Sequence, residues 1–511
     1  MMHLVWLIWV VVFLTIRSIY RLYFHPLAKI PGPRLAAITH LPEFYHNVIR
    51  NGMFIWEIEK MHQKYGPIVR INPREVHIND PYYYSEVYGG GARVRDKDPI
   101  SVAVYSSPGS TVATVKHAQH RLRRSLLSPF YSKKAIMEAE PMVQEKVGKL
   151  LNHFETAYQT QSILGLNRVF QAFTAEVATH HFYGSSFDML GNEQFSRAIQ
   201  DSIDAITRTS PFNKLFPTIG ALLRFIPPWI LVRLRPAMSG IVRLQETYTT
   251  KTRNALAARN ESEFASNDSR DTPFTVLINP KLPQEERSLH RLLDEQMAIL
   301  GAGSESTTNT LTVAMFHLLN NGAIYLKLRR ELEGIMPTPT SIARLSQTQH
   351  LPYLTAVINE SLRLSFAGSS RFPRVAPTEC LAYRSYVIPP GSDETHHKTP
   401  VSMSSYFLHM DNQIFPEPEK FNPDRWILAD ERGERLFKFI GSFTKGSRIC
   451  LGIHLAYAEI YLALAAIVRR FDIELYETTA EDIRFTRDLL GPRSEKGVWK
   501  VQARVTNMIS K

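Results

Sequence analysis

The chain has 511 residues, of which 44% are hydrophobic and 21% are charged, values that suit a globular protein with a large core. Its 60 basic and 48 acidic residues give a formal net charge of +12, which favours an anionic partner such as a phospholipid surface or an acidic protein. The sequence has no zinc-finger spacing and no long basic run, so nucleic acid is the least favoured partner. Cys380 and Cys450 are the only cysteines, which excludes a disulfide framework and suits a reducing compartment.

The first predicted element is an apolar helix near the N-terminus. Leu4–Ile16 is almost entirely apolar, and no acidic or basic residue other than His3 precedes Arg17. A spanning helix needs about 20 residues, which the flanking apolar residues can complete. A cleaved secretory signal is disfavoured, because the run has no basic start and Tyr20 stands where small residues precede a cleavage site. We therefore expect a membrane anchor over 1–24 and then a proline-rich hinge over 25–40.

Behind the hinge, the hydrophobic pattern predicts a single large, mainly α domain with a minor β region over 41–511. Two short strands, Gly66–Asn72 and Glu75–Asn79, flank a turn at Pro73, and further strand-like pieces follow over 375–390. A polar loop is expected over 260–271. Helical periodicity is clear at Trp56–Tyr65, His117–Leu127, Lys146–Phe154, Met238–Asn260, Leu289–Asn320, Ala356–Leu364 and Ile453–Phe471.

The second cysteine, Cys450, lies just ahead of the last of these helices. The partial positive charge at a helix start favours a thiolate over a thiol. Gly446 and Gly452 let the backbone approach a flat cofactor closely, and Arg448 offers donors suited to a carboxylate such as a heme propionate. A cysteine thiolate is also an axial ligand of heme iron that favours O–O cleavage. The combination predicts that Cys450 binds the iron of a heme, whereas Cys380 has no such context and is expected in the core or in a strand.

The same segment matches every defined position of the signature F-x-x-G-x-R-x-C-x-G, through Phe443, Gly446, Arg448, Cys450 and Gly452. The chain thereby resembles the cytochrome P450 superfamily. The resemblance implies the P450 fold over the whole chain, a heme b cofactor that these residues help to bind, and electrons from NADPH supplied by a flavin-bearing NADPH–cytochrome P450 reductase. Tyr20–Ala37 and the 66–80 hairpin are similar to fungal secondary-metabolism members of the trichodiene-oxygenase-like group.

Glu360 and Arg363 lie three residues apart in a predicted helix, a spacing that by itself usually marks a surface pair. In the family this E-x-x-R pair is buried and is joined by an arginine from a later segment, matched here by Arg425 in Phe421–Trp426. The resemblance therefore implies a structural triad of Glu360, Arg363 and Arg425 on the thiolate side of the heme.

The middle of the long helix resembles the family segment A-G-x-[DE]-T. Ala302 and Gly303 match the small residues that make room for dioxygen beside the heme, and Glu305 matches the acid of a proton relay. Ser306 stands where threonine is usual, and it lacks the methyl group that restricts the hydroxyl rotamer. The resemblance implies that Glu305 and Ser306 are catalytic. Because serine replaces threonine at 306, either the coupling of electrons to product is looser or the substrate supplies a hydroxyl of its own.

The helix at 117–124 resembles the family helix that carries W-x-x-x-R. Arg124 matches the arginine and His120 takes the tryptophan position, while Arg374 matches another propionate ligand. These three residues are implied to bind heme propionates. Basic residues nearby suggest a docking patch for an acidic reductase on the thiolate face, formed by Arg121, Arg123, Lys133, Lys134 and Lys445.

The implied function is a monooxygenase of the endoplasmic reticulum membrane, with its catalytic domain facing the cytosol. It would hydroxylate or epoxidise a small hydrophobic secondary metabolite, a terpenoid or a polyketide. A heme-thiolate isomerase or dehydratase that works without dioxygen, and a non-catalytic heme sensor, are the alternatives; the retained Glu305–Ser306 pair favours the oxygenase. Substrate contacts are expected from largely apolar segments at Asp98–Val115, Ala198–Leu223, Met297–Gly301, Phe366–Phe372 and Leu489–Pro492.

One segment departs from the family pattern. The polar Ser392–Lys398 stands between Gly391 and Thr399, which are usually adjacent in the family. It is either a tolerated surface loop or a retained-intron artefact of gene prediction. If it is part of the protein, we expect it near the sheet on the substrate side, where it can disturb the strands.

Overall fold

Helix α15 (Leu289–Asn320) runs through the core of the protein. The computed structural model describes residues 2–91, 93–223, 225–261, 271–391 and 398–509. Every residue from Thr307 to Phe316 is buried, because this half of α15 presents small or apolar groups on all sides. The other half, which includes Glu305, is only partly covered. A single helix thus joins the packed core to the more open side of the molecule.

Four helices surround the buried half of α15 and share the largest hydrophobic cluster with it. They are α8 (Glu140–Thr160), α9 (Leu166–Tyr183), α18 (Pro352–Leu364) and α21 (Ile453–Arg470). The predicted helix at Lys146–Phe154 is confirmed but extends further at both ends. It begins earlier because Pro141 suits the first turn of a helix. The prediction was too short because the outer turns are polar and lack the apolar pattern.

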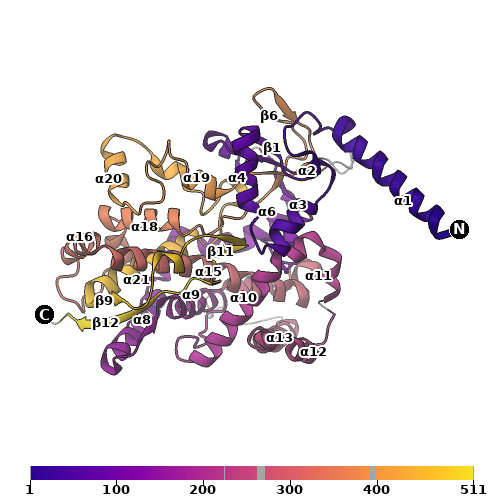
Figure 1. Cartoon of the computed structure of the whole chain (residues 1–511). Helices are drawn as coiled ribbons and strands as arrows, with labels where there is room; N and C mark the ends of the chain where they lie inside the picture. Colours follow the sequence, from indigo (N-terminus) through magenta and orange to yellow (C-terminus); the bar gives the residue numbers. More distant parts are fainter. Residues whose placement is uncertain (1, 92, 224, 262–270, 392–397, 510–511) are drawn as a thin grey trace.

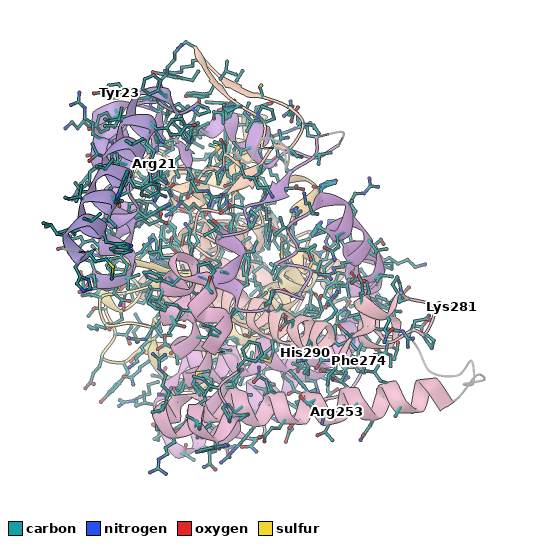
Figure 2. The ribbon with its side chains drawn as sticks, turned by 90° about the vertical axis from the view of Figure 1, so that its right-hand side faces the viewer. Arg21, Tyr23, Arg253, Phe274, Lys281 and His290 are labelled. Atoms are coloured by element: carbon teal, nitrogen blue, oxygen red, sulfur yellow. The ribbon has the colours of Figure 1, made fainter. Side chains whose placement is uncertain are left out.

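Shorter helices cover this core. The predicted bounds of α6 (His117–Leu127) are confirmed. Helix α13, which bears Arg253, runs along one edge of the body (Figure 2). The remaining helices are α2 (Arg34–Ile38), α3 (Leu41–Phe44), α4 (Phe54–Tyr65), α5 (Tyr84–Tyr88), α7 (Lys133–Glu138), α10 (Glu193–Leu215), α11 (Pro217–Leu223), α12 (Pro228–Leu234), α13 (Ser239–Glu261), α14 (Pro273–Leu277), α16 (Gly322–Glu333), α17 (Leu345–Thr348), α19 (Ser405–His409) and α20 (Asp424–Glu431).

The principal sheet has the strand order β1-β2-β8-β5-β3, and only β2 and β8 pair in parallel. Its strands are β1 (Ile68–Arg70), β2 (Val76–Ile78), β3 (Asp96–Lys97), β5 (Arg374–Val375) and β8 (Val401–Ser402). The predicted hairpin of β1 and β2 is confirmed. The Asn72 side chain shapes its turn by accepting the backbone N–H groups of Arg74 at 2.9 Å and Glu75 at 2.8 Å.

Smaller sheets complete the fold. Strands β4 (Leu164–Gly165), β12 (Gln502–Met508) and β9 (Phe471–Leu475) form one, and two hairpins pair β6 (Leu381–Tyr383) with β7 (Tyr386–Ile388) and β10 (Arg487–Leu489) with β11 (Gly491–Arg493). Cys380 was expected in the core or in a strand; that prediction was wrong, because it lies exposed just before β6.

Helix α1 (Met2–Ile19) projects from the body of the protein (Figure 1) and buries none of its residues. With the π-helical turn Tyr20–Phe24 it is the one helix in the described part of the chain that is long and apolar enough to cross a membrane. Arg21 ties its end to the body by donating to the carbonyl of Ile38 at 2.5 Å. Figure 2 shows Arg21 and Tyr23 at this junction.

Two predictions fall on residues that the structure does not describe. The polar loop expected over 260–271 includes residues 262–270, which lie outside the described residues. The segment Ser392–Lys398, which departs from the family pattern, includes residues 392–397, which also lie outside them.

Candidate functional site

The loop that holds Cys450 lies between a short 3-10 turn at Gly446–Arg448 and the start of α21. The Cys450 backbone N–H donates to the carbonyl of Phe443 at 2.9 Å, which closes the loop on itself. The Phe443 ring packs at 5.4 Å from the ring of Tyr457 in α21. The loop is therefore fixed to the helix that follows it.

Glycine is required at Gly446 by protein contacts. Its φ is +74°, a conformation that side chains rarely adopt, and a Cβ there would collide with the carbonyls of Tyr88 and Gly89. Gly452 differs, since its φ is −86° and a Cβ would meet no protein atom within 4 Å. The close approach of Gly452 to a cofactor stays a prediction, whereas at Gly446 a protein contact alone is enough to require glycine.

The Cys450 side chain is exposed, yet the protein around it removes enough water to raise the pKa of its thiol. The Gly452 N–H and the Arg124 guanidinium act in the opposite direction, as a helix start should, but desolvation outweighs them. The helix start thus favours the thiolate as predicted, and burial of the sulfur opposes it. Binding of a metal to the sulfur would supply the missing driving force for deprotonation.

Arg124, Arg374, Arg448 and His120 converge near this loop. Arg124 donates to the Ile449 carbonyl at 2.6 Å, and Arg448 donates to the Thr114 and Val115 carbonyls at 2.6 and 2.7 Å. No ion pair joins the three arginines to a carboxylate in the described ranges of the chain. Burial and the mutual repulsion of these groups lower the pKa of Arg448 to about 9 and that of His120 to about 2.

Glu360, Arg363 and Arg425 meet as the sequence predicted, and all three are buried. Arg363 donates to both carboxylate oxygens of Glu360, at 2.7 and 3.0 Å, and Arg425 donates to Oε1 at 3.1 Å. Two further donors were not predicted: the indole N–H of Trp426 at 2.9 Å and the backbone N–H of Asn422 at 2.9 Å. Glu360 thereby fixes the segment after Phe421 to α18.

The accessible face of α15 carries Ala302 and Ser306, both of which are exposed. The Ser306 hydroxyl donates to the carbonyl of Ala302 at 2.9 Å. Gly303, which was predicted together with Ala302 to make room for dioxygen, has a packing role as well. A Cβ on Gly303 would stand 2.8 Å from the Cβ of Ala178, so this glycine serves the close packing of α15 against α9.

The carboxylate of Glu305 is turned towards strand β11 and Arg493, a residue that the sequence did not single out. Nη1 of Arg493 lies 2.5 Å from Oε1 of Glu305, and Nη2 donates to the Thr207 hydroxyl of α10 at 2.8 Å. Arg493 is only 3% exposed. The predicted relay acid is therefore joined by one buried cation to a hairpin and to a helix of the expected substrate region.

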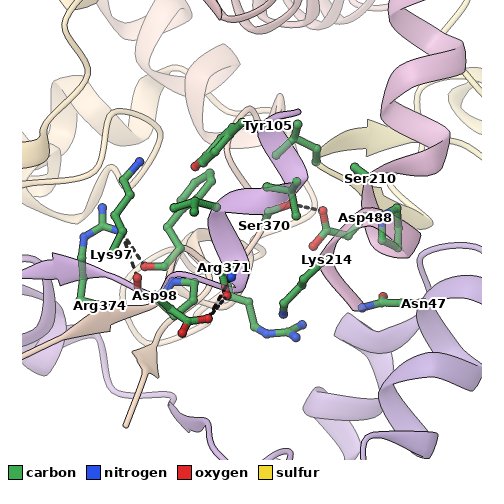
Figure 3. Close-up of a pocket in the computed structure, with 17 residues that line it drawn as sticks. Asn47, Lys97, Asp98, Tyr105, Ser210, Lys214, Ser370, Arg371, Arg374 and Asp488 are labelled. Atoms are coloured by element: carbon green, nitrogen blue, oxygen red, sulfur yellow. Dashed lines mark hydrogen bonds between the residues drawn. The ribbon is translucent and has the colours of Figure 1, made fainter. Parts of the chain in front are cut away.

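A small pocket with a cavity volume of about 60 Å³ lies next to this region and is partly open to solvent (Figure 3). Its lining includes residues from four of the five segments that were predicted to contact substrate, at 98–105, 210–214, 370–372 and Leu490. The fifth predicted segment, 297–301, contributes no lining residue. The wall is more charged than predicted, with Lys97, Asp98, Lys214, Arg371, Arg374 and Asp488.

Several of these charges are neutralised by a buried network that the sequence did not reveal. Lys214 of α10 lies 2.8 Å from Glu43 and 3.7 Å from Glu75, and Arg371 pairs with the same two carboxylates. The two cations hold the pKa of Glu43 well below its usual range despite its burial. The network joins α10 to the segments next to the hinge.

The predicted docking patch is only partly present. Arg121, Lys133 and Lys134 are exposed and Lys445 is half-buried. Including Arg123 was wrong, because it is buried and its Nε lies 2.8 Å from the carboxylate of Glu286.

Comparison with known proteins assigns the family. The family model described as Cytochrome P450 matches residues 31–501. The chain is 42% identical over 502 residues to the cytochrome P450 monooxygenase aflU of Aspergillus parasiticus, with 98% of both chains covered. It is 42% identical over 471 residues to the cytochrome P450 monooxygenase TRI4 of Trichoderma arundinaceum, with 91% of this chain and 88% of the relative covered. It is also 42% identical over 480 residues to conidiogenone synthase PchP450 of Penicillium rubens, with 94% of each chain covered. The chain therefore belongs to the cytochrome P450 family, and its fold and enzyme class are those of a P450 monooxygenase.

Proposed function

We propose that this P450 monooxygenase hydroxylates or epoxidises a small hydrophobic secondary metabolite, a terpenoid or a polyketide, with electrons from an NADPH-dependent flavin reductase. The observation that supports this most directly is the accessible sulfur of Cys450 beside buried cations that have no carboxylate partner in the described chain. The fungal relatives, whose names include a conidiogenone synthase, support a secondary metabolite as the substrate.

The residues present fit a heme. Nδ1 of His120 is buried and has no hydrogen-bond partner, and Arg124, Arg374 and Arg448 offer cationic donors suited to carboxylates. In this proposal Cys450 would bind the heme iron, His120 and the three arginines would hold the propionates, and Phe443, Gly446 and Gly452 would shape the cysteine loop. Heme bound in this way supplies an iron that activates dioxygen.

Residues of the chain then position the proton donors. Ala302 and Ser306 face the accessible side of α15, and we assign the Ser306 hydroxyl and the Glu305 carboxylate to proton delivery. In the described residues Glu305 bonds to Arg493 and Ser306 bonds to Ala302, so the two groups of the proposed relay do not contact each other directly. Gly303 contributes by packing α15 against α9, which keeps this face in place.

The triad has a structural role in this proposal. Glu360 holds Arg363, Arg425 and Trp426 in one buried cluster, and Ser442 of the cysteine loop donates to the Leu362 carbonyl of the same helix at 2.8 Å. The cluster thus positions the loop without touching the reacting atoms.

We further propose that the chain is anchored in the membrane of the endoplasmic reticulum. Residues 2–24 form an apolar, unburied helix, and Arg17 and Arg21 at its end favour a cytosolic catalytic body. The anchor is tested by separating membranes from supernatant after expression of the full chain and of residues 25–511; equal sedimentation of both would contradict it.

The substrate is best identified by deleting the gene in the native host and isolating the metabolite that accumulates. That metabolite is then given to membranes that contain the full chain and the reductase, with isotopically labelled dioxygen. Label in the product, formed only with NADPH, supports the proposal. An unlabelled product formed without NADPH would instead indicate an isomerase or dehydratase. Absence of ligand-dependent NADPH oxidation with every accumulating metabolite would indicate a sensor.

A further inference from the structure

Asp488 of β10 is an acid of the pocket wall that forms no ion pair with any residue in the described part of the chain. Asp98, the other acid of the wall, lies 2.8 Å from Arg74. The Asp488 carboxylate accepts a hydrogen bond from the Ser370 hydroxyl (Figure 3). Burial raises the pKa of Asp488, which shows that the carboxylate has lost much of its water. A carboxylate has room for about four donors, so Asp488 can accept further hydrogen bonds from a molecule in the pocket.

The basic side chains beside Asp488 are paired with other carboxylates. Lys214 lies 2.8 Å from Glu43, and Arg371 pairs with Glu43 and, at 2.9 Å, with Glu75. Burial outweighs the attraction of these two cations in its effect on the pKa of Asp488. Both cations would still repel a second positive charge placed next to them. A neutral donor therefore suits the free acceptor positions of Asp488 better than an ammonium group does.

Other polar groups lie at the same end of the pocket. Asn47 and Ser210 line it, and neither side chain has a hydrogen-bond partner among the described residues. Figure 3 shows both on the same side of the pocket as Asp488. Apolar side chains also line the pocket, namely Val102, Val104, Phe372 and Leu490. A polar end within a partly apolar wall suits an apolar molecule that carries a hydroxyl group.

The size of the pocket fits one end of such a molecule. Its cavity volume is about 60 Å³, whereas sites that enclose a whole small molecule span roughly 300–1,000 Å³. The rest of the molecule must then extend beyond the pocket.

The hairpin that carries Asp488 also touches Glu305, the acid of the proposed relay. A Cβ on Gly491 would stand 2.6 Å from Oε1 of Glu305, so the tip of the hairpin lies against this carboxylate. Asp488 pairs with Pro492 across the hairpin and is three positions from Gly491, so the Cα atoms of 488 and 491 are at most about 11 Å apart. A molecule of terpenoid or polyketide size can therefore have one end at Asp488 and the other near Glu305.

We propose that Asp488 accepts a hydrogen bond from a hydroxyl group of the substrate, while Ser370 holds the carboxylate in place. The inference rests on the proposed function and names the substrate class within it, an apolar metabolite that already carries a hydroxyl away from the carbon to be oxidised. Asp488 would repel a carboxylate at this position, and Lys214 and Arg371 would repel an ammonium group. A reaction that installs the hydroxyl, such as an earlier oxygenation or a carbonyl reduction, must supply this substrate.

The first test uses the metabolite that accumulates when the gene is deleted, and we expect it to carry a free hydroxyl. Analogues that each lack one hydroxyl are compared with it for binding to the full-length holoprotein, through the change in the heme absorption spectrum. One analogue should bind about ten- to a hundredfold more weakly, because a hydrogen bond to a charged group is lost. A metabolite without any hydroxyl that wild type oxidises, or equal affinity for the metabolite and all its analogues, would overturn the proposal.

The second test removes the acceptor. The backbone of β10 is held separately from the side chain, since the Asp488 N–H donates to the Gly52 carbonyl at 2.9 Å, so we expect Asp488→Leu and Asp488→Asn to fold. Asp488→Leu should bind the metabolite about ten- to a hundredfold more weakly and should no longer distinguish it from the analogue identified in the first test. Asp488→Asn keeps a carbonyl acceptor and should lie between. Asp188→Asn, at a residue that is 67% exposed, is the matched loss of one negative charge and should bind like wild type.

The two compounds separate recognition from a structural role. Equal weakening for the metabolite and the analogue in Asp488→Leu would show a structural role and overturn the proposal. The same weakening in Asp188→Asn as in Asp488→Asn would show a general effect of charge and overturn it too. If Asp488→Leu binds no heme, Asp488→Asn provides the same comparison. A wild-type protein that binds no heme, or that forms unlabelled product without NADPH, would instead contradict the proposed function.

Discussion

Arg493 of β11 and Glu305 of α15 form a short ion pair, with 2.5 Å between Nη1 and Oε1, in which the cation is 3% and the carboxylate 20% exposed. Arg493 also donates to Thr207 at 2.8 Å and lies 3.4 Å from Asp204, both in α10. The guanidinium therefore holds two carboxylates and a hydroxyl from separate elements in one place, and it determines where the Glu305 carboxylate points.

We expect Arg493→Gln to disturb the position of Glu305 and to leave two carboxylates close together without their cation. The free energy of unfolding should fall by about 1–3 kcal/mol. With the identified substrate, the variant should also release more hydrogen peroxide per NADPH oxidised. Calorimetry and a peroxide assay measure the two effects. Arg484→Gln, at a residue that is 61% exposed, is the matched control. Wild-type coupling in Arg493→Gln would contradict a link between this pair and proton delivery.

Glu360→Ala should yield protein with little or no heme. The substitution leaves the charges of Arg363 and Arg425 and the N–H of Trp426 buried without their acceptor, at a cost of about 3–5 kcal/mol. Heme per chain, measured as the pyridine hemochrome, tests this. Glu333→Ala, at an exposed position of α16, should keep its heme. A Glu360→Ala protein with full heme content would refute the structural role.

Ser306 should influence how many electrons reach the product. Its hydroxyl donates to Ala302, and without a methyl group it has more rotamers than threonine. We expect Ser306→Ala to release more hydrogen peroxide per NADPH than wild type, and Ser306→Thr to release less. Equal yields in all three proteins would remove Ser306 from the relay.

His409 should make stability depend on pH. Its Nε2 accepts the backbone N–H of Gly441 at 2.8 Å, so the bound ring is neutral, and burial together with Arg363 lowers its pKa to about 3. The unfolded chain takes up a proton near the ordinary value of 6.5. The contribution of His409 to stability is thus complete above that value and declines as pH falls towards 3.

Denaturant unfolding at neutral pH and at about pH 5 measures this loss, which for one proton amounts to at most about 1.4 kcal/mol per pH unit. His409→Asn keeps an acceptor for Gly441 and cannot be protonated, so its stability should vary less with pH than that of wild type. An identical pH dependence in both proteins would show that His409 is not the source.

The exposed lysines of α7 should matter for electron delivery. Replacing both Lys133 and Lys134 by glutamate should slow NADPH oxidation with limiting reductase at low salt, and the difference should shrink as salt screens the charges. Lys60→Glu on α4 is the control for a change of surface charge elsewhere. A double variant with wild-type rates at every salt concentration would exclude this part of the docking patch.

The sequence predicts the elements whose pattern is periodic or whose motif is contiguous. The bounds of α6 and α15 and the β1–β2 hairpin are confirmed because their apolar spacing and turn residues are local signals. The burial of Arg123 had such a signal too, since His120, Arg123 and Leu127 recur at helical spacing on one face.

Partners brought together from distant segments could not be predicted in this way. Arg493 and Trp426 acquire their roles only when β11 and α20 pack near α15 and α18. Arg493 has no motif around it, and the motif that ends at Trp426 indicated a role for Arg425 alone. The same is true of Gly303, whose neighbour Ala178 belongs to α9, and of the cations that surround Glu43. At Cys450 the sequence shows the helix start that favours the thiolate, but it does not show the desolvation that opposes it.

The cysteine loop is held from outside its own neighbourhood. Gly446 fits against Tyr88 and Gly89, Arg448 bonds to Thr114, and Ile449 accepts from Arg124, so each fastening spans more than three hundred residues of chain. Contacts of such high sequence separation form slowly, since the loops that they close must first be ordered. We expect the cysteine to reach its place late in folding, after the first and last thirds of the chain have docked. A nascent chain that has just emerged through Gly452 would already possess every residue of the signature and still depend on the earlier segment to make the site.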